Sequence, residues 1–232
     1  MIKLNSKSKK LLLLQRNELL TQTQNLIRKK FGRFLFTNFF INYFQNKNIE
    51  KITEELFLKE FETFKHFLPN SVNNIMDIGC GLGIINVYLN NFFGKKPIFF
   101  LLDKNRIDKK IKYGFSSNYE SYNDLNETKN ILLENDVDIS SLYLFDVEKE
   151  FQINKKMDLV ISLKSMGYHY PINTYIELFR NCCTKDTVFI YDIGENQYDE
   201  IYLKTVFDDI KIIYEEKTNN ILRRVCCKNF KL

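Results

Sequence analysis

The chain has 232 residues, of which 44% are hydrophobic and 15% are aromatic. This is enough for one domain with a full core, and it excludes an intrinsically disordered chain. Eight glycines and three prolines also exclude collagen-like and linker-dominated proteins. There is no alanine, and 27 of the 34 basic residues are lysine, a skew typical of an AT-rich genome. The number of lysines is therefore weak support for any particular function.

The net charge of +5 is unevenly distributed. Residues 1–34 hold nine basic residues and one acidic residue, a net charge of +8, so the other 198 residues sum to −3. A basic arm of this kind can attract phosphates or an anionic surface. The plainer interpretation, which we favour, is a solvated tail and helix face in a lysine-rich chain. We expect residues 1–34 to be dispensable for binding of a cofactor in the core and to affect only the interaction with a partner.

The five cysteines argue against a disulfide framework. Their number is odd, Cys182–Cys183 and Cys226–Cys227 are sequence neighbours, and no pair has zinc-finger spacing. We therefore expect a reducing, cytoplasmic environment and no metal site. No apolar run approaches the ~20 residues of a membrane span, so none is predicted.

The first third of the chain predicts helices. Apolar residues recur at helical intervals over residues 11–27, an aromatic segment covers 31–44, and a third helix is expected over 52–67, ending before Pro69. These segments predict a helical N-terminal cap with a basic arm, residues 1–69, which we expect to cap the ligand pocket and help select the substrate.

From residue 70 onward short apolar runs alternate with helical segments. The runs are typical of buried strands and cover residues 75–79, 98–103, 142–146, 158–163, 187–192, 210–214 and 221–227. Helices are expected over residues 84–93, 123–134 and 173–182. The alternation predicts an α/β domain over residues 70–232: a doubly wound, mostly parallel seven-stranded sheet with a terminal antiparallel hairpin. Ligands bind such sheets at the carboxyl ends of the strands.

The most specific motif is Asp77-Ile78-Gly79-Cys80-Gly81-Leu82-Gly83, a strand that runs into a glycine turn and then a helix. Glycines at alternate positions allow a tight turn and a close approach of a ligand to the backbone. Asp103 ends the next strand, where a carboxylate can accept hydrogen bonds from a ribose. Asp146 ends the third strand and could bind an adenine amino group. Together these positions predict a site for an adenosine-bearing ligand.

The glycine pattern distinguishes between such ligands. The dinucleotide fingerprint requires a glycine at position 84, where this chain has Ile84, which disfavours a nicotinamide oxidoreductase. The pattern instead resembles motif I of the class I S-adenosylmethionine-dependent methyltransferases, and the resemblance covers residues 75–227. It implies S-adenosylmethionine as the cofactor. The implied cofactor-binding residues are Asp77, Gly79, Cys80, Gly81, Gly83, Asp103, Lys104, Asp146, Val147 and Ser162.

In that family the segment after the fourth strand, here residues 162–171, lies beside the transferred methyl group. The Asn/Asp-Pro-Pro-aromatic signature of amino methylation is absent. The segment instead places His169 between two tyrosines, and a histidine can accept a proton from a substrate hydroxyl near neutral pH. A purely structural His169 is an equally good interpretation. The expected substrate contacts are Lys164, Tyr168 and Tyr170.

The segment of residues 104–122 is long for a connection between a strand and a helix. We favour a substrate lid, with Tyr113 and Phe115 as contacts, over a surface excursion. The favoured function is O-methylation of a sugar- or lipid-like small molecule. The alternatives are an RNA or protein methyltransferase, nucleic acid being the less favoured partner, and a catalytically silent binding subunit. The sequence leaves the oligomeric state open.

Overall fold

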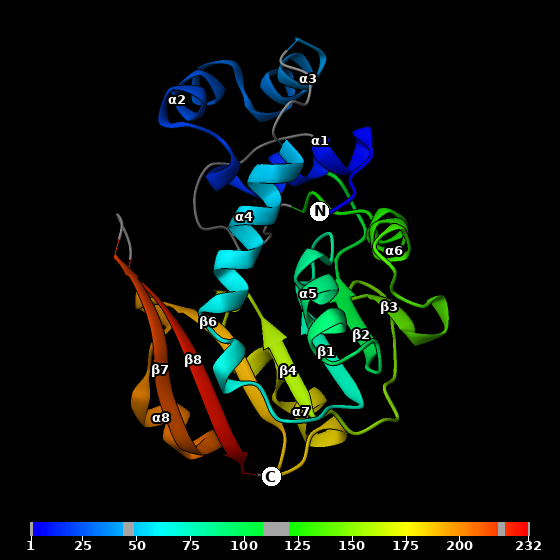
Figure 1. The fold of residues 1–232 in the computed structure, drawn as a ribbon. Helices are drawn as coiled ribbons and strands as arrows, with labels where there is room; N and C mark the ends of the chain where they lie inside the picture. Colours follow the sequence, from blue (N-terminus) through cyan, green and yellow to red (C-terminus); the bar gives the residue numbers. More distant parts are fainter. Residues whose placement is uncertain (1, 44–48, 109–120, 218–220, 232) are drawn as a thin grey trace.

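The computed structural model describes residues 2–43, 49–108, 121–217 and 221–231. Its centre is a seven-stranded sheet in the order β3-β2-β1-β4-β6-β8-β7 (Figure 1). Neighbouring strands are parallel, except that β8 is antiparallel to both β6 and β7. The predicted fold class is confirmed. The strands of the sheet are β1 (Asn74–Ile78), β2 (Ile98–Asp103), β3 (Leu142–Asp146), β4 (Leu159–Ser162), β6 (Val188–Gly194), β7 (Phe207–Lys217) and β8 (Ile221–Phe230).

Helices cover both faces of the sheet, which explains why its central strands are mostly apolar and buried. In β1, Ile75 and Met76 are both fully buried but point to opposite faces, because side chains alternate along a strand. Ile75 packs in a core with α4 (Ile49–Glu62), α5 (Ile84–Phe92) and α6 (Leu125–Glu134). Met76 packs in a second core with α7 (Ile176–Cys182) and α8 (Glu200–Val206).

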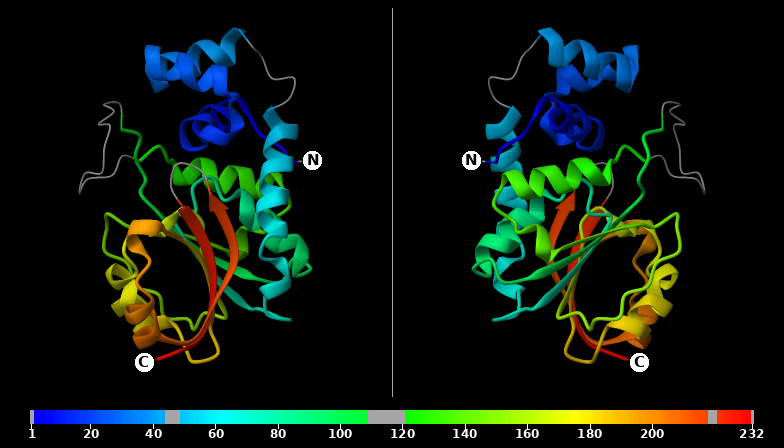
Figure 2. Two further views of the ribbon diagram at one scale, coloured as in Figure 1. Left: turned by 90° about the vertical axis from the view of Figure 1, so that its left-hand side faces the viewer. Right: turned by 90° about the vertical axis from the view of Figure 1, so that its right-hand side faces the viewer.

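The N-terminal segment folds over the edge of the sheet where the parallel strands end (Figures 1 and 2). It contains α1 (Ser6–Gln15), a short 3₁₀ turn (Asn17–Leu19), α2 (Gln22–Phe31) and α3 (Arg33–Tyr43). The single helix predicted over residues 11–27 is therefore wrong. The backbone is extended at Arg16, and Thr21 starts a new helix through a capping box with Gln24.

The first residues of the chain do not form a solvated tail. Ile2 and Leu4 are buried, and the leucines of α1 are part of the core. Asn5 Nδ2 donates a hydrogen bond of 2.6 Å to Glu127 of α6, and Lys7 forms an ion pair of 2.6 Å with Asp124. The interpretation of this segment as a solvated arm is corrected accordingly, since its start is packed onto the α/β core.

Two elements were not predicted. β5 (Ser165–Tyr170) follows β4 and packs against β6 without joining the sheet. The helix α8 lies between β6 and β7 in the sequence. A 3₁₀ turn, Lys65–Phe67, follows α4, and three more precede β3, α7 and α8: Ile139–Ser141, Ile172–Tyr175 and Glu195–Gln197.

No helix among the described residues combines the length and apolar character needed to cross a membrane.

Candidate active site

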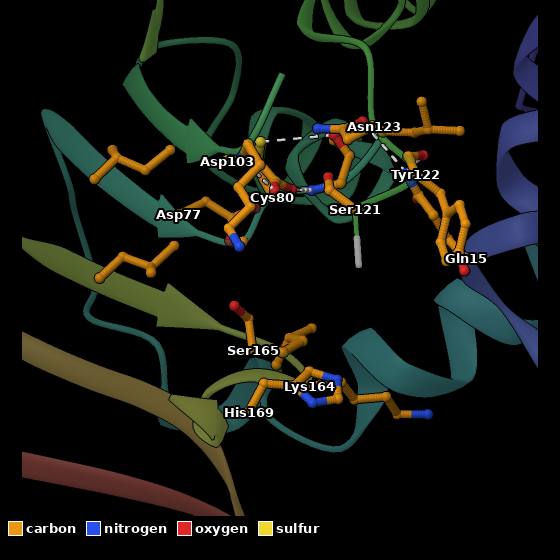
Figure 3. A pocket seen from close by; sticks show the side chains of 18 of the residues that line it. Gln15, Asp77, Cys80, Asp103, Ser121, Tyr122, Asn123, Lys164, Ser165 and His169 are labelled. Atoms are coloured by element: carbon orange, nitrogen blue, oxygen red, sulfur yellow. Dashed lines mark hydrogen bonds between the residues drawn. The ribbon is translucent and has the colours of Figure 1, made fainter. Parts of the chain in front are cut away.

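A cavity of about 910 Å³ lies between the carboxyl edge of the sheet and the N-terminal helices. Its lining comes from the glycine turn, the ends of β2 and β3, β5 and the N-terminal segment. Figure 3 shows two groups of side chains facing each other across the open space: Asp77, Cys80 and Asp103 on one side, and Lys164, Ser165 and His169 on the other. The cavity therefore brings together the two parts of the predicted site.

The three glycines of the turn all have positive φ, between 53° and 73°, but for different reasons. A Cβ at Gly79 would overlap the Ser165 side chain, and one at Gly83 would lie 3.1 Å from Thr128 Cγ2. These two glycines are required by packing inside the protein. A Cβ at Gly81 would meet only the Gln15 side chain, at 3.0 Å. Gly81 is thus the glycine that leaves room for a ligand.

Asp77 is buried at the end of β1. It accepts a hydrogen bond of 2.6 Å from Asn86 Nδ2 of α5. Loss of hydration raises the pKa of this carboxyl to about 7, against a usual value near 4. A cationic group bound nearby would favour the ionised form.

Asp103 ends β2 and lines the same cavity. Its Oδ2 accepts a hydrogen bond of 2.7 Å from the Gly81 N–H, and its Oδ1 accepts one of 2.7 Å from the Lys104 N–H. Burial raises the pKa of this carboxyl to about 6. Each carboxylate oxygen has further lone-pair capacity, so Asp103 can still accept hydrogen bonds from the hydroxyls of a ligand.

The remaining predicted cofactor residues divide into two groups. Cys80, Lys104 and Val147 line the cavity, whereas Asp146 and Ser162 are not among its described lining residues. Asp146 lies opposite Asp103 in the register of β2 and β3. Ser162 Oγ donates to Ile78 O at 2.7 Å and accepts from Met166 N at 2.9 Å. Ser162 thus ties β4 to β1 and β5.

The predicted catalytic and substrate residues in β5 and before it all line the cavity: Lys164, Tyr168, His169 and Tyr170. Burial lowers the pKa of His169, so the imidazole is neutral at pH 7 and can accept a proton. Its ring centroid lies 4.9 Å from that of Tyr168, edge to face. Lys104 Nζ lies 5.5 Å from the centroid of the Tyr170 ring.

Tyr113 and Phe115, the other predicted substrate contacts, lie outside the described residues, as does most of the predicted lid. The described ends of that segment are held together. Ile107 forms an antiparallel bridge with Tyr122, and the Asp108 N–H donates a hydrogen bond of 2.8 Å to Ser121 O. Within the described part of the chain, no three His, Cys, Asp or Glu side chains gather as a metal site would require.

Comparison with known proteins gives a fold but no close relative. No family model matches the chain, and no curated protein matches its sequence. Among solved structures, StiE O-MT is 10% identical with a TM-score of 0.53, over 91% of this chain and 83% of that one. A protein of Pyrococcus horikoshii named as a transferase is 12% identical with a TM-score of 0.51, over 76% and 64%. The 16S rRNA N2 G1207 methyltransferase of T. thermophilus, in complex with AdoMet and guanosine, is 9% identical with a TM-score of 0.49, over 75% and 42%.

The chain has the class I methyltransferase fold. The predicted resemblance is confirmed at the level of the fold. Within this methyltransferase fold, the glycine turn and the acid of β2 lie where the motif predicted, at the carboxyl ends of adjacent strands. The N-terminal helices close the cavity from the opposite side.

The N-terminal helices line the cavity, which agrees with the expectation that the helical segment before residue 70 caps the pocket. Gln15, Arg16, Glu18 and Arg33 all line it. That residues 1–34 are dispensable for cofactor binding stays a prediction. Glu18 forms an ion pair with Lys164, and Gln15 Nε2 donates a hydrogen bond of 2.9 Å to Tyr122 O. No motif in this segment could have revealed these contacts. Ser165 also lines the cavity and was missed.

A buried chain of charges supports this side of the cavity. Arg224 of β8 is 2% exposed and bonds both carboxylate oxygens of Asp192, at 2.7 and 2.9 Å. The same guanidinium lies 3.4 Å from Glu60, which pairs with Arg16 at 3.2 Å. Asp192 also accepts a hydrogen bond from the Lys164 N–H at 3.1 Å. These contacts connect the sheet, the N-terminal helices and the start of β5.

Proposed function

We propose that the protein is an S-adenosylmethionine-dependent methyltransferase that methylates a hydroxyl group of a sugar- or lipid-like small molecule. The observation that carries this proposal is the single cavity lined by Gly81, Asp103 and His169. An adenosine-binding edge and a candidate proton acceptor thus share one space.

The residues of the cavity fit this cofactor. Gly81 leaves room for its amino-acid part, and the raised pKa of Asp77 suits a site that receives the cofactor's cationic groups. Asp103 can accept hydrogen bonds from the ribose, and Lys104 and Val147 lie beside it in the lining. Bound there, the cofactor supplies a methyl group already activated by its sulfonium charge.

His169 would supply the base. Because burial keeps the imidazole neutral at pH 7, it can take the proton of an acceptor hydroxyl as the oxygen attacks. Lys164, Tyr168 and Tyr170 would align the acceptor, and the N-terminal helices would limit the access of water. In this proposal residues 1–69 form the acceptor-side cap and residues 70–232 form the cofactor-binding domain.

The five cysteines are free and buried, which supports a reducing, cytoplasmic location.

Calorimetry with S-adenosylmethionine, S-adenosylhomocysteine and NAD tests the cofactor. We expect the first two to bind and NAD not to bind, whereas binding of NAD alone would refute the proposal. Incubation with the cofactor and a metabolite extract, followed by mass spectrometry, should reveal an acceptor that gains one methyl group.

An RNA or protein acceptor is the second candidate, supported by the exposed Lys29 and Lys30. It predicts binding of RNA, or of an acidic protein, that weakens steeply with salt.

A further inference from the structure

The corner between α2 and α3, residues 26–35, exposes large apolar side chains. Gly32 alone separates the two helices, and together they form the outermost layer of the molecule, beyond α1 (Figure 2). Exposed side chains at the corner are Leu26 (66%), Ile27 (42%), Phe31 (60%) and Leu35 (72%). Ile27 and Phe31 are four residues apart and share a helix face. Apolar groups clustered in this way at a surface indicate an interaction site.

Other side chains of both helices already pack against the rest of the molecule, so the exposed ones are not needed for the core. Arg28 is buried and donates a hydrogen bond of 3.1 Å to Leu13 O of α1. Phe36 of α3 is buried, and Phe34 packs edge to face with Tyr122 at 5.7 Å between ring centroids. Helix α3 is therefore apolar on its inner and outer sides, a property of helices that are covered on both.

The charges at the corner distinguish between the possible binding partners of this surface. Lys29 and Lys30 are exposed, and neither ion-pairs with a carboxylate of the described residues, whereas Lys7 and Lys9 both do. Lysines interleaved with leucine and phenylalanine match an anionic lipid surface, which attracts the lysines and accepts the apolar side chains. A nucleic acid would bind the lysines but leave the apolar groups in water. A symmetric dimer through the corner would bring the lysines of both copies together.

We propose that the α2–α3 corner docks on the surface of an anionic lipid membrane, with its apolar side chains at the boundary between headgroups and acyl chains. Arg33 belongs to the same corner, lines the cavity, and lies 5.0 Å from the centroid of the Tyr122 ring. Docking would therefore place one wall of the cavity close to the membrane. The proposal goes beyond the proposed function and does not depend on it, because membrane binding requires neither the cofactor nor an acceptor.

Co-sedimentation of the full chain with lipid vesicles tests the docking. Vesicles of phosphatidylcholine mixed with phosphatidylglycerol should bind the protein, and pure phosphatidylcholine vesicles should bind it much more weakly. Replacing Leu26, Phe31 and Leu35 together by serine should reduce the partition coefficient by about tenfold or more. The double variant Lys29→Gln/Lys30→Gln should lose about fivefold per lysine. Ile201→Ser removes a side chain that is 82% exposed on α8, outside the corner, and should change nothing.

Thermal unfolding and cofactor calorimetry on the same variants show whether each is folded, and they test the proposed function separately. Absence of binding to anionic vesicles would overturn the docking proposal. So would binding that the triple serine variant retains in full. Self-association that disappears in the triple variant, without vesicle binding, would assign the corner to a second copy. RNA binding that depends on the lysines but not on the apolar side chains, again without vesicle binding, would assign it to nucleic acid.

Discussion

The two sides of the cavity are built in different ways. On the cofactor side, the contacts join the glycine turn to the end of the neighbouring strand β2: the Gly79 N–H donates a hydrogen bond of 2.7 Å to Leu102 O, and the Gly81 N–H donates one of 2.7 Å to the Asp103 carboxylate. On the acceptor side, side chains far apart in the sequence meet, as in the ion pair between Glu18 and Lys164. The first side follows from a short motif, whereas the second exists only once the N-terminal helices have packed on the sheet.

The same difference extends to energetics. The cofactor side relies on hydrogen bonds donated by backbone N–H groups of the glycine turn, one of them to the Asp103 carboxylate. The acceptor side relies on buried charges, Arg224 with Asp192 and Glu60 with Arg16. Removal of one partner from such a group leaves an uncompensated buried charge. The acceptor side should therefore be the more sensitive to single substitutions, and the substitutions below test this.

The largest effect is expected from His169→Gln. A positioned base contributes about 10²–10⁴-fold to a rate, so turnover should fall by that factor while cofactor affinity changes less than about threefold. In the parent protein the rate should rise with pH through a histidine pKa below the usual ~6.5, because burial lowers that pKa. His66→Gln is the matched control, since His66 does not line the cavity among the described residues. Parental turnover in His169→Gln would exclude the base.

The next largest effect is expected from Arg224→Met. It leaves Asp192 and Glu60 without their buried cation, and the expected loss is about 3–5 kcal/mol of the free energy of unfolding. At about 2–4 °C per kcal/mol for a chain of this size, the midpoint of thermal unfolding should fall by about 10 °C. Arg180→Met is the control, because Arg180 pairs with Glu177 on the surface and should contribute less than about 1 kcal/mol. Equal shifts in both variants would contradict the role of the buried charges.

Gly81→Leu tests the cofactor side. The leucine side chain would enter the cavity, so affinity for S-adenosylmethionine should fall at least about hundredfold in calorimetry. Gly94→Leu imposes a similar backbone cost at φ 67°, but nothing lies within 4 Å of its Cβ position. It should be destabilised to a similar extent and still bind the cofactor. Loss of binding in both variants would mean that backbone strain, rather than occupied ligand space, is responsible.

The contrast between the two sides also explains what could be predicted from the sequence. The bounds of β2 and β3 are as predicted, because each is a short apolar run that ends in an aspartate. The break between α1 and α2 was missed although Thr21 and Gln24 have the spacing of a capping box. β5 contains a glycine, a histidine and two tyrosines without the alternation of a strand. Contacts such as Glu18 with Lys164 have no signal in spacing, since they join residues 146 positions apart.

The smallest effect expected is a pH dependence of cofactor affinity that arises on one side only. The pKa of Asp77 is raised to about 7 and that of Asp103 to about 6, so both carboxyls carry protons at pH 5 and lose them by pH 8. A cationic ligand favours the ionised forms. Binding below about pH 7 must therefore release protons, so affinity should rise with pH up to about 7, by at most about tenfold per pH unit for each proton, and level off by pH 8. Calorimetry in buffers of different ionisation enthalpy measures the protons released.

Asp77→Asn should weaken binding and flatten the pH dependence of cofactor affinity near pH 7, whereas His169→Gln should leave that dependence unchanged. A parental dependence in Asp77→Asn would assign the linkage to a different group.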